Sequence, residues 1–167
     1  MVALVAQQFQ GKNIGLIGTK RTVQSGVYAR KIQELGQGIT LHSLATPLLA
    51  PMIEEGFFNN QISHEIIAQY LSDPELQNID GLILACTHYP LIKKEIGQFY
   101  HNKMNILDSS EVVALALKNY LQQQNLLNPE QKATDHFLVS DYTESFESSA
   151  RMFFHDSVRL EKHQLWD

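Results

Sequence analysis

Short apolar runs alternate with amphipathic helical segments along most of this chain. Apolar runs of this length are typical of buried strands, and they occupy residues 14–17, 39–44, 82–85 and 105–107. Apolar residues spaced three and four apart predict the intervening helices, over residues 23–35, 62–71, 91–100 and 112–121. Strands that alternate with helices pair most simply in parallel, because each helix carries the chain back across the sheet. The pattern therefore predicts an α/β fold with a mostly parallel sheet flanked by helices.

The remaining segments are shorter or more polar. Residues 2–9 are predicted to form a helix, and Pro47 and Pro51 are expected to bracket a loop. Residues 122–135 read as a polar linker, which is followed by a strand over 136–139, a helix over 145–154 and a last strand over 158–160. Composition alone would place a domain boundary in this linker.

Bulk properties narrow the classes of partner. A net charge of −5 argues against the nucleic-acid backbone as a partner. No apolar run approaches the ~20 residues needed to span a bilayer, so no membrane segment is expected. The first ten residues lack the basic flank of a signal peptide. One cysteine cannot form an internal disulfide, and this agrees with a cytoplasmic location.

That cysteine, Cys86, directly follows the apolar run 82–85 and precedes Pro90, a residue suited to the first turn of a helix. It is therefore expected at the carboxyl end of a strand, where open α/β sheets bind ligands. A helix dipole and the nearby His88 would favour a thiolate. A lone cysteine is also commonly a buried structural residue. Position alone does not choose between these two interpretations.

Three strand-end segments are expected to converge on one edge of the sheet, at residues 18–22, 47–54 and 86–90. The hydroxyls of Thr19, Thr22 and Thr87 can donate to a carboxylate, although capping a helix is the more frequent role of such threonines. Glu54 offers a carboxylate, although acidic residues at helix starts are often only solvated charges. Together these groups suit a small anionic ligand and the movement of a proton.

Several sharper motifs are absent. Residues 15–22 supply neither a phosphate-binding loop nor the glycine pattern of dinucleotide sites. A cysteine phosphatase would need an arginine where Ile92 stands, and a zinc-protease helix starting at His64 would need a second histidine where Ala68 stands. The other histidines show no spacing typical of metal ligands, so no metal site is predicted.

The segment Leu84-Ala85-Cys86-Thr87-His88-Tyr89-Pro90-Leu91 closely resembles the second cysteine segment of bacterial glutamate racemases. Gly15 to Thr22, followed by Ser25 and Tyr28, is similar to their Gly-Thr-x-x-Thr segment, and Pro47 to Glu54 is similar to their Pro-x-x-x-Pro-x-x-Glu segment. The order and spacing of the three segments agree with that family, and the resemblance extends from about Val2 to about Leu160.

The resemblance implies a racemase that needs no cofactor and interconverts L- and D-glutamate for peptidoglycan synthesis. Two cysteines on opposite faces of the α-carbon would move the proton, and Cys86 would be one of them. By the same resemblance, His88 and Glu54 assist Cys86 as a catalytic proton relay. Thr87 binds the substrate, and Thr19 and Thr22 lie nearby.

The chain also departs from that family. The family's first half, with its own cysteine, is expected before Met1, and this sequence contains no second cysteine. The resemblance divides the chain into a central α/β domain at 1–107 and a returning part of an incomplete domain at 108–167. An incomplete domain should expose apolar surface and associate, as a homo-oligomer or with another chain. Two alternatives stay open, a carboxylate-binding module that does not racemise and a relative that acts on aspartate or another small acid.

Overall fold

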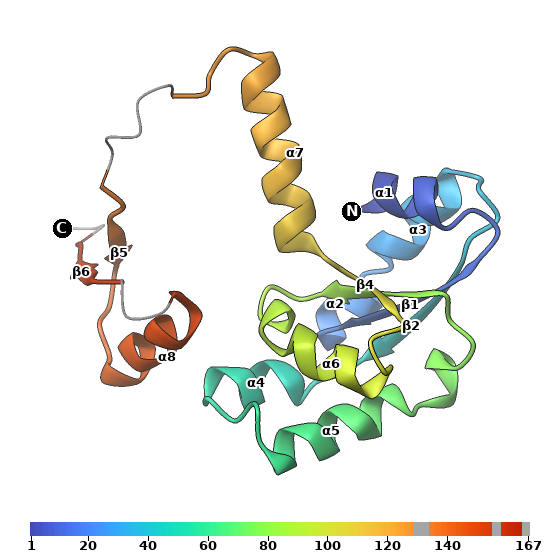
Figure 1. Cartoon of the computed structure of the whole chain (residues 1–167), viewed down its shortest axis with the longest axis horizontal. Helices are drawn as coiled ribbons and strands as arrows, with labels where there is room; N and C mark the ends of the chain where they lie inside the picture. The colour runs from blue at the N-terminus through green and yellow to red at the C-terminus, as the bar shows by residue number, and fades with distance from the viewer. Residues whose placement is uncertain (129–133, 155–157, 165–167) are drawn as a thin grey trace. The chain divides into compact units, whose positions relative to one another are not determined.

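The computed structural model describes residues 1–128, 134–154 and 158–164 (Figure 1). The chain divides into two compact units, Met1–Tyr120 and Leu121–Asp167, and each is described here by itself. The predicted boundary after residue 107 stays a prediction. Among the described residues, no helix combines the length and the apolar character needed to cross a membrane.

The first unit is built on a four-stranded parallel sheet with strand order β2-β1-β3-β4. Its strands are β1 (Asn13–Gly18), β2 (Thr40–Ala45), β3 (Gly81–Ala85) and β4 (Asn105–Asp108). β1 and β3 are the central strands, and their residues from Ile14 to Gly18 and from Gly81 to Ala85 are all buried. A strand covered on both faces must be apolar throughout, which explains the short unbroken apolar runs in the sequence. The predicted α/β class and parallel sheet are confirmed.

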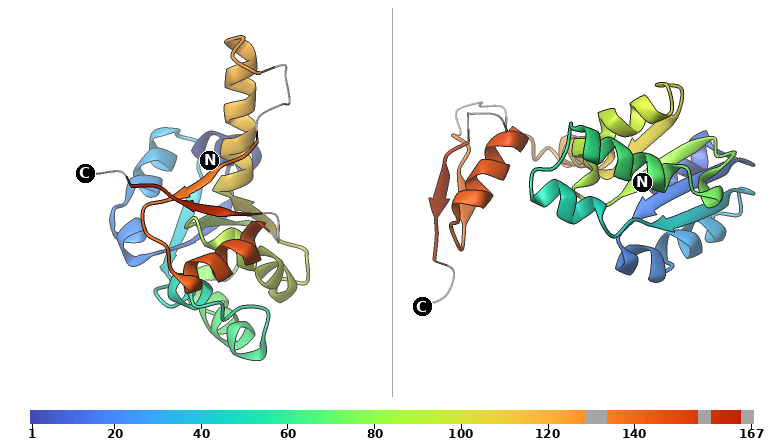
Figure 2. Two further views of the ribbon diagram at one scale, coloured as in Figure 1. Left: turned by 90° about the vertical axis from the view of Figure 1, so that its left-hand side faces the viewer. Right: turned by 90° about the horizontal axis from the view of Figure 1, so that it is seen from below.

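Helices cover both faces of this sheet (Figure 1 and Figure 2). On one face lie α1 (Val2–Gln8) and α3 (Val27–Glu34), and on the other α5 (Gln61–Leu71) and α6 (Lys93–Phe99). The core on the side of α1 and α3 consists of buried apolar side chains from both helices and from alternate strand positions: Val5, Phe9, Ile14, Leu16, Ile32, Ile83, Ala85 and Leu107. At Gly81, an added Cβ would lie 2.7 Å from the Phe9 ring, so a side chain at this position would force the ring to move.

Two sequence predictions were wrong in detail. The helix expected over 23–35 is two helices, α2 (Lys20–Gln24) and α3, because Gly26 between them has a left-handed backbone with φ of 63°. A loop was expected between Pro47 and Pro51, but helix α4 (Leu49–Glu54) begins inside this segment. Pro51 is tolerated there because the first turn of a helix has no internal partners for its N–H groups.

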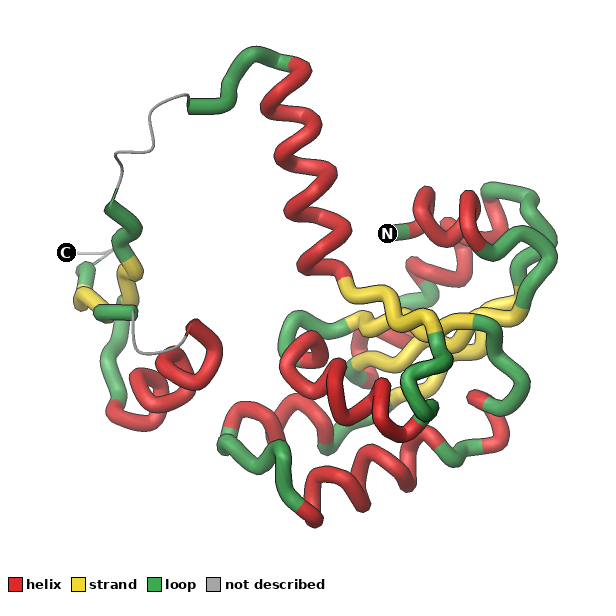
Figure 3. Tube along the Cα trace, viewed as in Figure 1, coloured by secondary structure: helices red, strands yellow, loops and turns green. Residues whose placement is uncertain are grey.

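The other connections follow the sequence closely. Short 3-10 turns, η1 (Pro74–Leu76) and η2 (Tyr89–Ile92), flank β3, and Pro90 lies in the first turn of η2. Helix α7 (Ser109–Gln123) follows β4 directly, as the tube in Figure 3 shows. Asp108 caps the start of α7, because the Glu111 N–H donates to Asp108 Oδ1 over 3.1 Å.

The second unit contains β5 (Phe137–Val139), α8 (Glu144–Phe154) and β6 (Leu160–Lys162). The two strands pair in parallel, Phe137 opposite Leu160, with α8 as the crossover between them. The last strand was predicted at 158–160 and begins two residues later. In the predicted linker, α7 continues to Gln123, and residues 129–133 lie outside the described residues.

Candidate active site

The carboxyl ends of three neighbouring strands meet on one edge of the sheet. Gly18 at the end of β1 is paired with Ala45 of β2 on one side and with Ala85 of β3 on the other. Each strand is directly followed by a residue on this same edge: Thr19 after β1, Thr46 after β2 and Cys86 after β3. Such strand ends are where open parallel sheets place their ligand sites.

Cys86, His88 and Glu54 form a continuous row of contacts at this edge. Cys86 Sγ lies 3.7 Å from His88 Nδ1, and His88 Nε2 lies 3.2 Å from Glu54 Oε1. The thiol is half-buried, while the side chains of His88 and Glu54 are 33% and 56% exposed. Both ring nitrogens of the histidine are thus engaged, one with a thiol and one with a carboxylate. An imidazole held in this way can carry a proton between the thiol and the carboxylate.

Helix α4 and turn η2 bring these three residues together. Glu54 is the last residue of α4, whose buried side chains Leu49, Met52 and Ile53 anchor the helix. His88 directly precedes η2 and its Pro90. The Tyr89 N–H donates to the carbonyl of Cys86 over 3.2 Å, which closes a tight turn right after the cysteine. The spacing Cys-x-His therefore places thiol and imidazole on the same side of one turn.

A buried hydrogen-bond network fixes this turn to the neighbouring strand. Tyr89 is fully buried, its hydroxyl donates to the carbonyl of Thr46 over 3.1 Å, and it lies 2.7 Å from Thr46 Oγ1. Thr46 is also fully buried and donates from Oγ1 to the carbonyl of Gly18. Burial raises the pKa of Tyr89 to about 12. The sequence prediction did not single out Thr46 or Tyr89, although Thr46 stands between a strand and Pro47, where a capping hydroxyl is common.

The three threonines do not behave alike. Thr19 caps α2, since its Oγ1 accepts from the Thr22 N–H over 3.2 Å, and the two hydroxyls lie 2.9 Å apart. The sequence left open whether these threonines cap a helix or bind a carboxylate. Thr19 does cap a helix. Thr87 is exposed, next to Cys86 in the chain. The register of β1 and β3 puts Thr19 and Cys86 on adjacent loops, because the residues before them are paired.

The site consists of a thiol, an imidazole, one carboxylate and hydroxyls. Within the described part of the chain, no group of three or more histidine, cysteine, aspartate or glutamate side chains has the arrangement of a metal site. The donor set at the strand ends suits proton transfer on a small molecule whose anionic group the hydroxyls can hold.

No protein-family profile matches the chain. Among curated proteins, it is 36% identical over 156 residues to the glutamate racemase of Chlorobium phaeobacteroides. This alignment covers 93% of this chain and 57% of that protein. It is also 36% identical over 165 residues to the glutamate racemase of Persephonella marina, covering 98% of this chain and 61% of that protein.

A solved structure with a similar fold is the glutamate racemase of Francisella tularensis in complex with D-glutamate. The TM-score is 0.85 and the identity 31%, over 99% of this chain and 60% of that one. This chain thus spans about three fifths of the length of the relatives it matches. By sequence and by fold, the chain is a partial-length homologue of the glutamate racemases.

Proposed function

We propose that this chain supplies one catalytic half of a glutamate racemase, with Cys86 as one of the two thiols that move the α-proton. The observation that carries the proposal is the row of contacts from Cys86 through His88 to Glu54 at the strand ends. Relatives over 30% identical across most of this chain are glutamate racemases, and this supports glutamate as the substrate.

In the proposed reaction, the Cys86 thiolate takes the proton from the α-carbon of glutamate. The electron pair left on that carbon spreads into the α-carboxylate, and a thiol on the opposite face returns a proton to give the other enantiomer. His88 receives the proton from the Cys86 thiol before each catalytic cycle, which leaves the thiolate. Glu54 orients the imidazole and stabilises its charged form. Thr87, with Thr19 and Thr22 at the start of α2, holds the carboxylate on which negative charge develops.

Inversion by two thiols needs a second cysteine, and these 167 residues contain one. The second thiol must therefore come from outside this sequence. We further propose that the chain acts in the cytoplasm to supply D-glutamate for peptidoglycan, and that it works in association with other polypeptide. Exposed apolar side chains on α7 support that association.

Hydrogen exchange at the α-carbon tests the role of Cys86 without needing complete racemisation. The chain is incubated with D- or L-glutamate in heavy water, and loss of the α-proton signal is followed by NMR. One thiol can exchange the proton of the enantiomer whose α-proton faces it, so we expect exchange of one enantiomer. Cys86→Ser should slow this exchange at least about 100-fold, because general bases contribute 10²–10⁴-fold in rate.

Neighbouring glutamates provide a matched control for the relay. Glu54→Gln should slow exchange about tenfold or more, because the imidazolium loses its carboxylate partner. Glu55→Gln removes an equal charge one residue later, at an exposed position, and should leave the rate unchanged. Undiminished exchange in Cys86→Ser, or equal effects of the two glutamine variants, would contradict the proposed roles.

The single cysteine also favours a second candidate, a carboxylate-binding module that does not racemise. Titration calorimetry with D-glutamate, L-glutamate and aspartate separates this candidate from the first. Binding of glutamate without any α-proton exchange would support the module. Stronger binding and faster exchange with aspartate would instead assign a different acidic substrate to the same site.

A further inference from the structure

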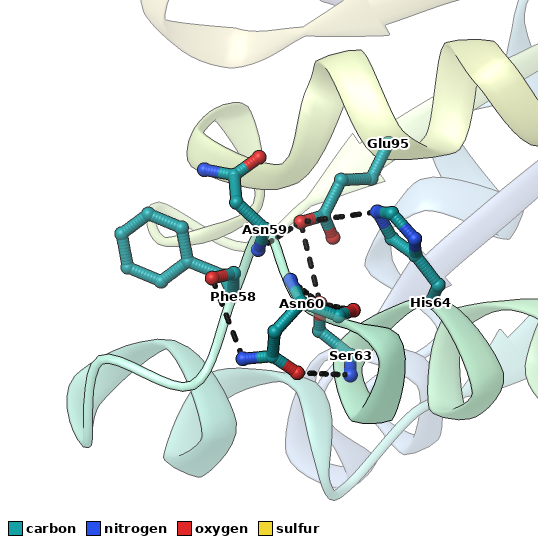
Figure 4. Close-up of polar contacts among 6 residues, drawn as sticks. All are labelled: Phe58, Asn59, Asn60, Ser63, His64 and Glu95. Carbon is teal, nitrogen blue, oxygen red and sulfur yellow. Dashed lines mark hydrogen bonds and ion pairs between the residues drawn. The ribbon is translucent and has the colours of Figure 1, made fainter.

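Glu95 on α6 is a buried carboxylate that holds the loop before α5. It is 4% exposed, and its Oε1 accepts from the Asn59 N–H and from Ser63 Oγ, the latter over 3.3 Å. His64 Nε2 lies 3.8 Å from the same oxygen. Figure 4 shows that these partners come from the end of the loop and from the first turn of α5. Glu95 therefore fastens the loop between α4 and α5 to α6.

This loop begins directly after Glu54, the carboxylate of the proposed relay. Four residues, 55–58, separate Glu54 from Asn59. Within the loop, the Phe57 N–H donates back to a carbonyl of α4 over 2.9 Å. Asn59 has a left-handed backbone with φ of 57°. This conformation is uncommon for a residue other than glycine and persists where the surrounding structure holds it. A displacement of Asn59 would therefore be carried along a short, tied loop to the end of α4.

Glu95 and His88 belong to one continuous segment of the chain. His88 directly precedes η2, and α6 begins at the residue after η2. Ile92 and Ile96 are fully buried and anchor η2 and α6 to the core. α4 packs against η2, and α5 packs against α6. The imidazole of the relay and the carboxylate on α6 are thus held by the same anchored part of the molecule.

The segment that runs from Glu54 to Asn59 and the segment that runs from His88 to Glu95 are joined at both ends. At one end, His88 Nε2 lies 3.2 Å from Glu54 Oε1, on side chains that are 33% and 56% exposed. At the other end, the Asn59 N–H donates to Glu95, which is buried. Hydrogen bonds are electrostatically stronger in a buried environment, and water competes with exposed ones. The contact on Glu95 is therefore the firmer of the two and limits how far the other end can move.

We propose that Glu95 is a positioning residue for the proton relay: by holding Asn59, it keeps the Glu54 carboxylate within reach of the His88 imidazole. This inference rests on the proposed function of Cys86, His88 and Glu54. The loss of Glu95 should lower the exchange rate only as far as the relay depends on Glu54, because an indirect effect cannot exceed the contribution of the group through which it acts.

Two replacements of Glu95 separate its hydrogen bond from its bulk. Glu95→Met gives an apolar side chain of similar length and removes the acceptor for Asn59. The chain should still fold, since Ser63 Oγ also donates to the carbonyl of Asn60 over 2.8 Å, and the Asn60 side chain still caps α5. Glu95→Gln keeps an oxygen that can accept from Asn59, so it should retain the contact. Ile96→Val, a buried change at the next residue of α6, controls for altered packing and should leave both measurements below unchanged.

The first measurement reads the contact itself and needs no catalysis. The chain is prepared with isotope-labelled histidine, and the NMR signal of the His88 Cε1–H group is identified by its loss in His88→Gln. Glu54→Gln moves this signal, because the ring loses its carboxylate partner. We expect Glu95→Met to move the signal in the same direction, and Glu95→Gln to leave it in place. A purely structural role in α6 would not move it, so an unmoved signal in Glu95→Met would overturn the proposal.

The second measurement combines Glu95→Met with Glu54→Gln in the α-proton exchange assay. Alone, Glu95→Met should slow exchange about threefold to tenfold, and no more than Glu54→Gln does. Added to Glu54→Gln, it should slow exchange no further, because the carboxylate that it positions is already absent. Multiplied effects of the two changes would show that Glu95 acts by another route and would overturn the proposal.

Failure of the proposed function would look different from failure of this inference. If the function failed, Cys86→Ser would exchange as fast as the unchanged chain, while the His88 signal would still respond to Glu95→Met. That signal would then support the positioning of Glu54 by itself.

Discussion

Tyr89 shows how one hydroxyl can hold a reactive turn in place. The residue lies three positions after Cys86, its ring is fully buried, and its hydroxyl contacts the carbonyl and Oγ1 of Thr46. Thr46 in turn reaches the end of β1 through Gly18. The network thus connects the ends of two strands to the turn that carries Cys86 and His88. The role of this network is structural, since both Thr46 and Tyr89 are fully buried and neither reaches solvent.

Replacing Tyr89 with phenylalanine removes this support while preserving the ring. The carbonyl of Thr46 still accepts a hydrogen bond from the Leu49 N–H, and Thr46 Oγ1 still donates to the carbonyl of Gly18. Few groups are therefore left without a partner. We expect the free energy of unfolding to fall by about 1 kcal/mol, the net value of one hydrogen bond. Chemical denaturation followed by circular dichroism measures this change.

Tyr28→Phe is the matched control for that measurement. Tyr28 is half-buried, and its hydroxyl makes no hydrogen bond with a described residue, so its loss should leave stability within about 0.5 kcal/mol of the original. Equal stability of Tyr89→Phe and the unchanged chain would mean that the network does not stabilise the turn.

At the scale of elements, Asp108 joins β4 to α7 and to the segment after β3. Lys93 Nζ lies 2.6 Å from Asp108 Oδ2 and 2.9 Å from Glu111 Oε1, and the Glu111 N–H caps onto Asp108 Oδ1. Burial raises the pKa of Asp108, but the hydrogen bond from Lys93 and the backbone bonds of α7 outweigh burial and hold the pKa below its ordinary value. Asp108 is therefore more stable as a carboxylate in the folded chain than in the unfolded chain.

This difference predicts a defined loss of stability in acid. Because the folded pKa is lowered, the stabilisation is complete well above the ordinary pKa of 3.8 and is lost as pH falls through the folded pKa. Asp108→Asn keeps an oxygen for the cap but removes the charge. It should cost about 1–3 kcal/mol at pH 7, and the difference from the unchanged chain should shrink below pH 3.8.

Urea denaturation at a series of pH values measures this dependence. Glu111→Gln is the control, since that side chain is 74% exposed and its ion pair should contribute within about 1 kcal/mol. A constant difference between Asp108→Asn and the unchanged chain from pH 7 down to pH 2 would contradict the assignment.

The elements that sequence could predict are those set by local pattern. Buried runs such as Leu82–Leu84 became central strands because strands covered on both faces must be apolar. The helix break at Gly26 was missed because the apolar spacing continues across it, and only the backbone angle shows the interruption. Helix α4 was missed because Pro51 normally marks a loop, whereas in the first turn it breaks no internal bond.

The site was predictable to the extent that its residues share one edge of the sheet. Cys86 and His88 are two residues apart, so their contact follows from a local turn. The contact between His88 and Glu54 spans separate elements, and sequence suggested it because both segments were expected at the same edge of the sheet. Thr46 and Tyr89 could not be recognised from type alone, since their value lies in complete burial and in mutual contact.

At the scale of the whole molecule, α7 exposes an apolar stripe. Val113, Leu117 and Tyr120 are spaced four and three residues apart, so they share one side of the helix, and they are 56%, 54% and 57% exposed. Helices with such stripes normally bury them against another element.

In the absence of other polypeptide, we expect this stripe to make copies of the chain associate. Val113→Lys with Leu117→Lys places two charges on the stripe and should raise the dissociation constant at least tenfold, since burying each apolar side chain is worth roughly 1.5–3 kcal/mol. Asn119→Lys with Gln122→Lys adds the same charge to exposed polar positions of α7 and controls for charge alone. Sedimentation velocity over a concentration series measures the association. A monomer at every concentration in the unchanged chain, or equal weakening by the two lysine pairs, would show that the stripe does not mediate self-association.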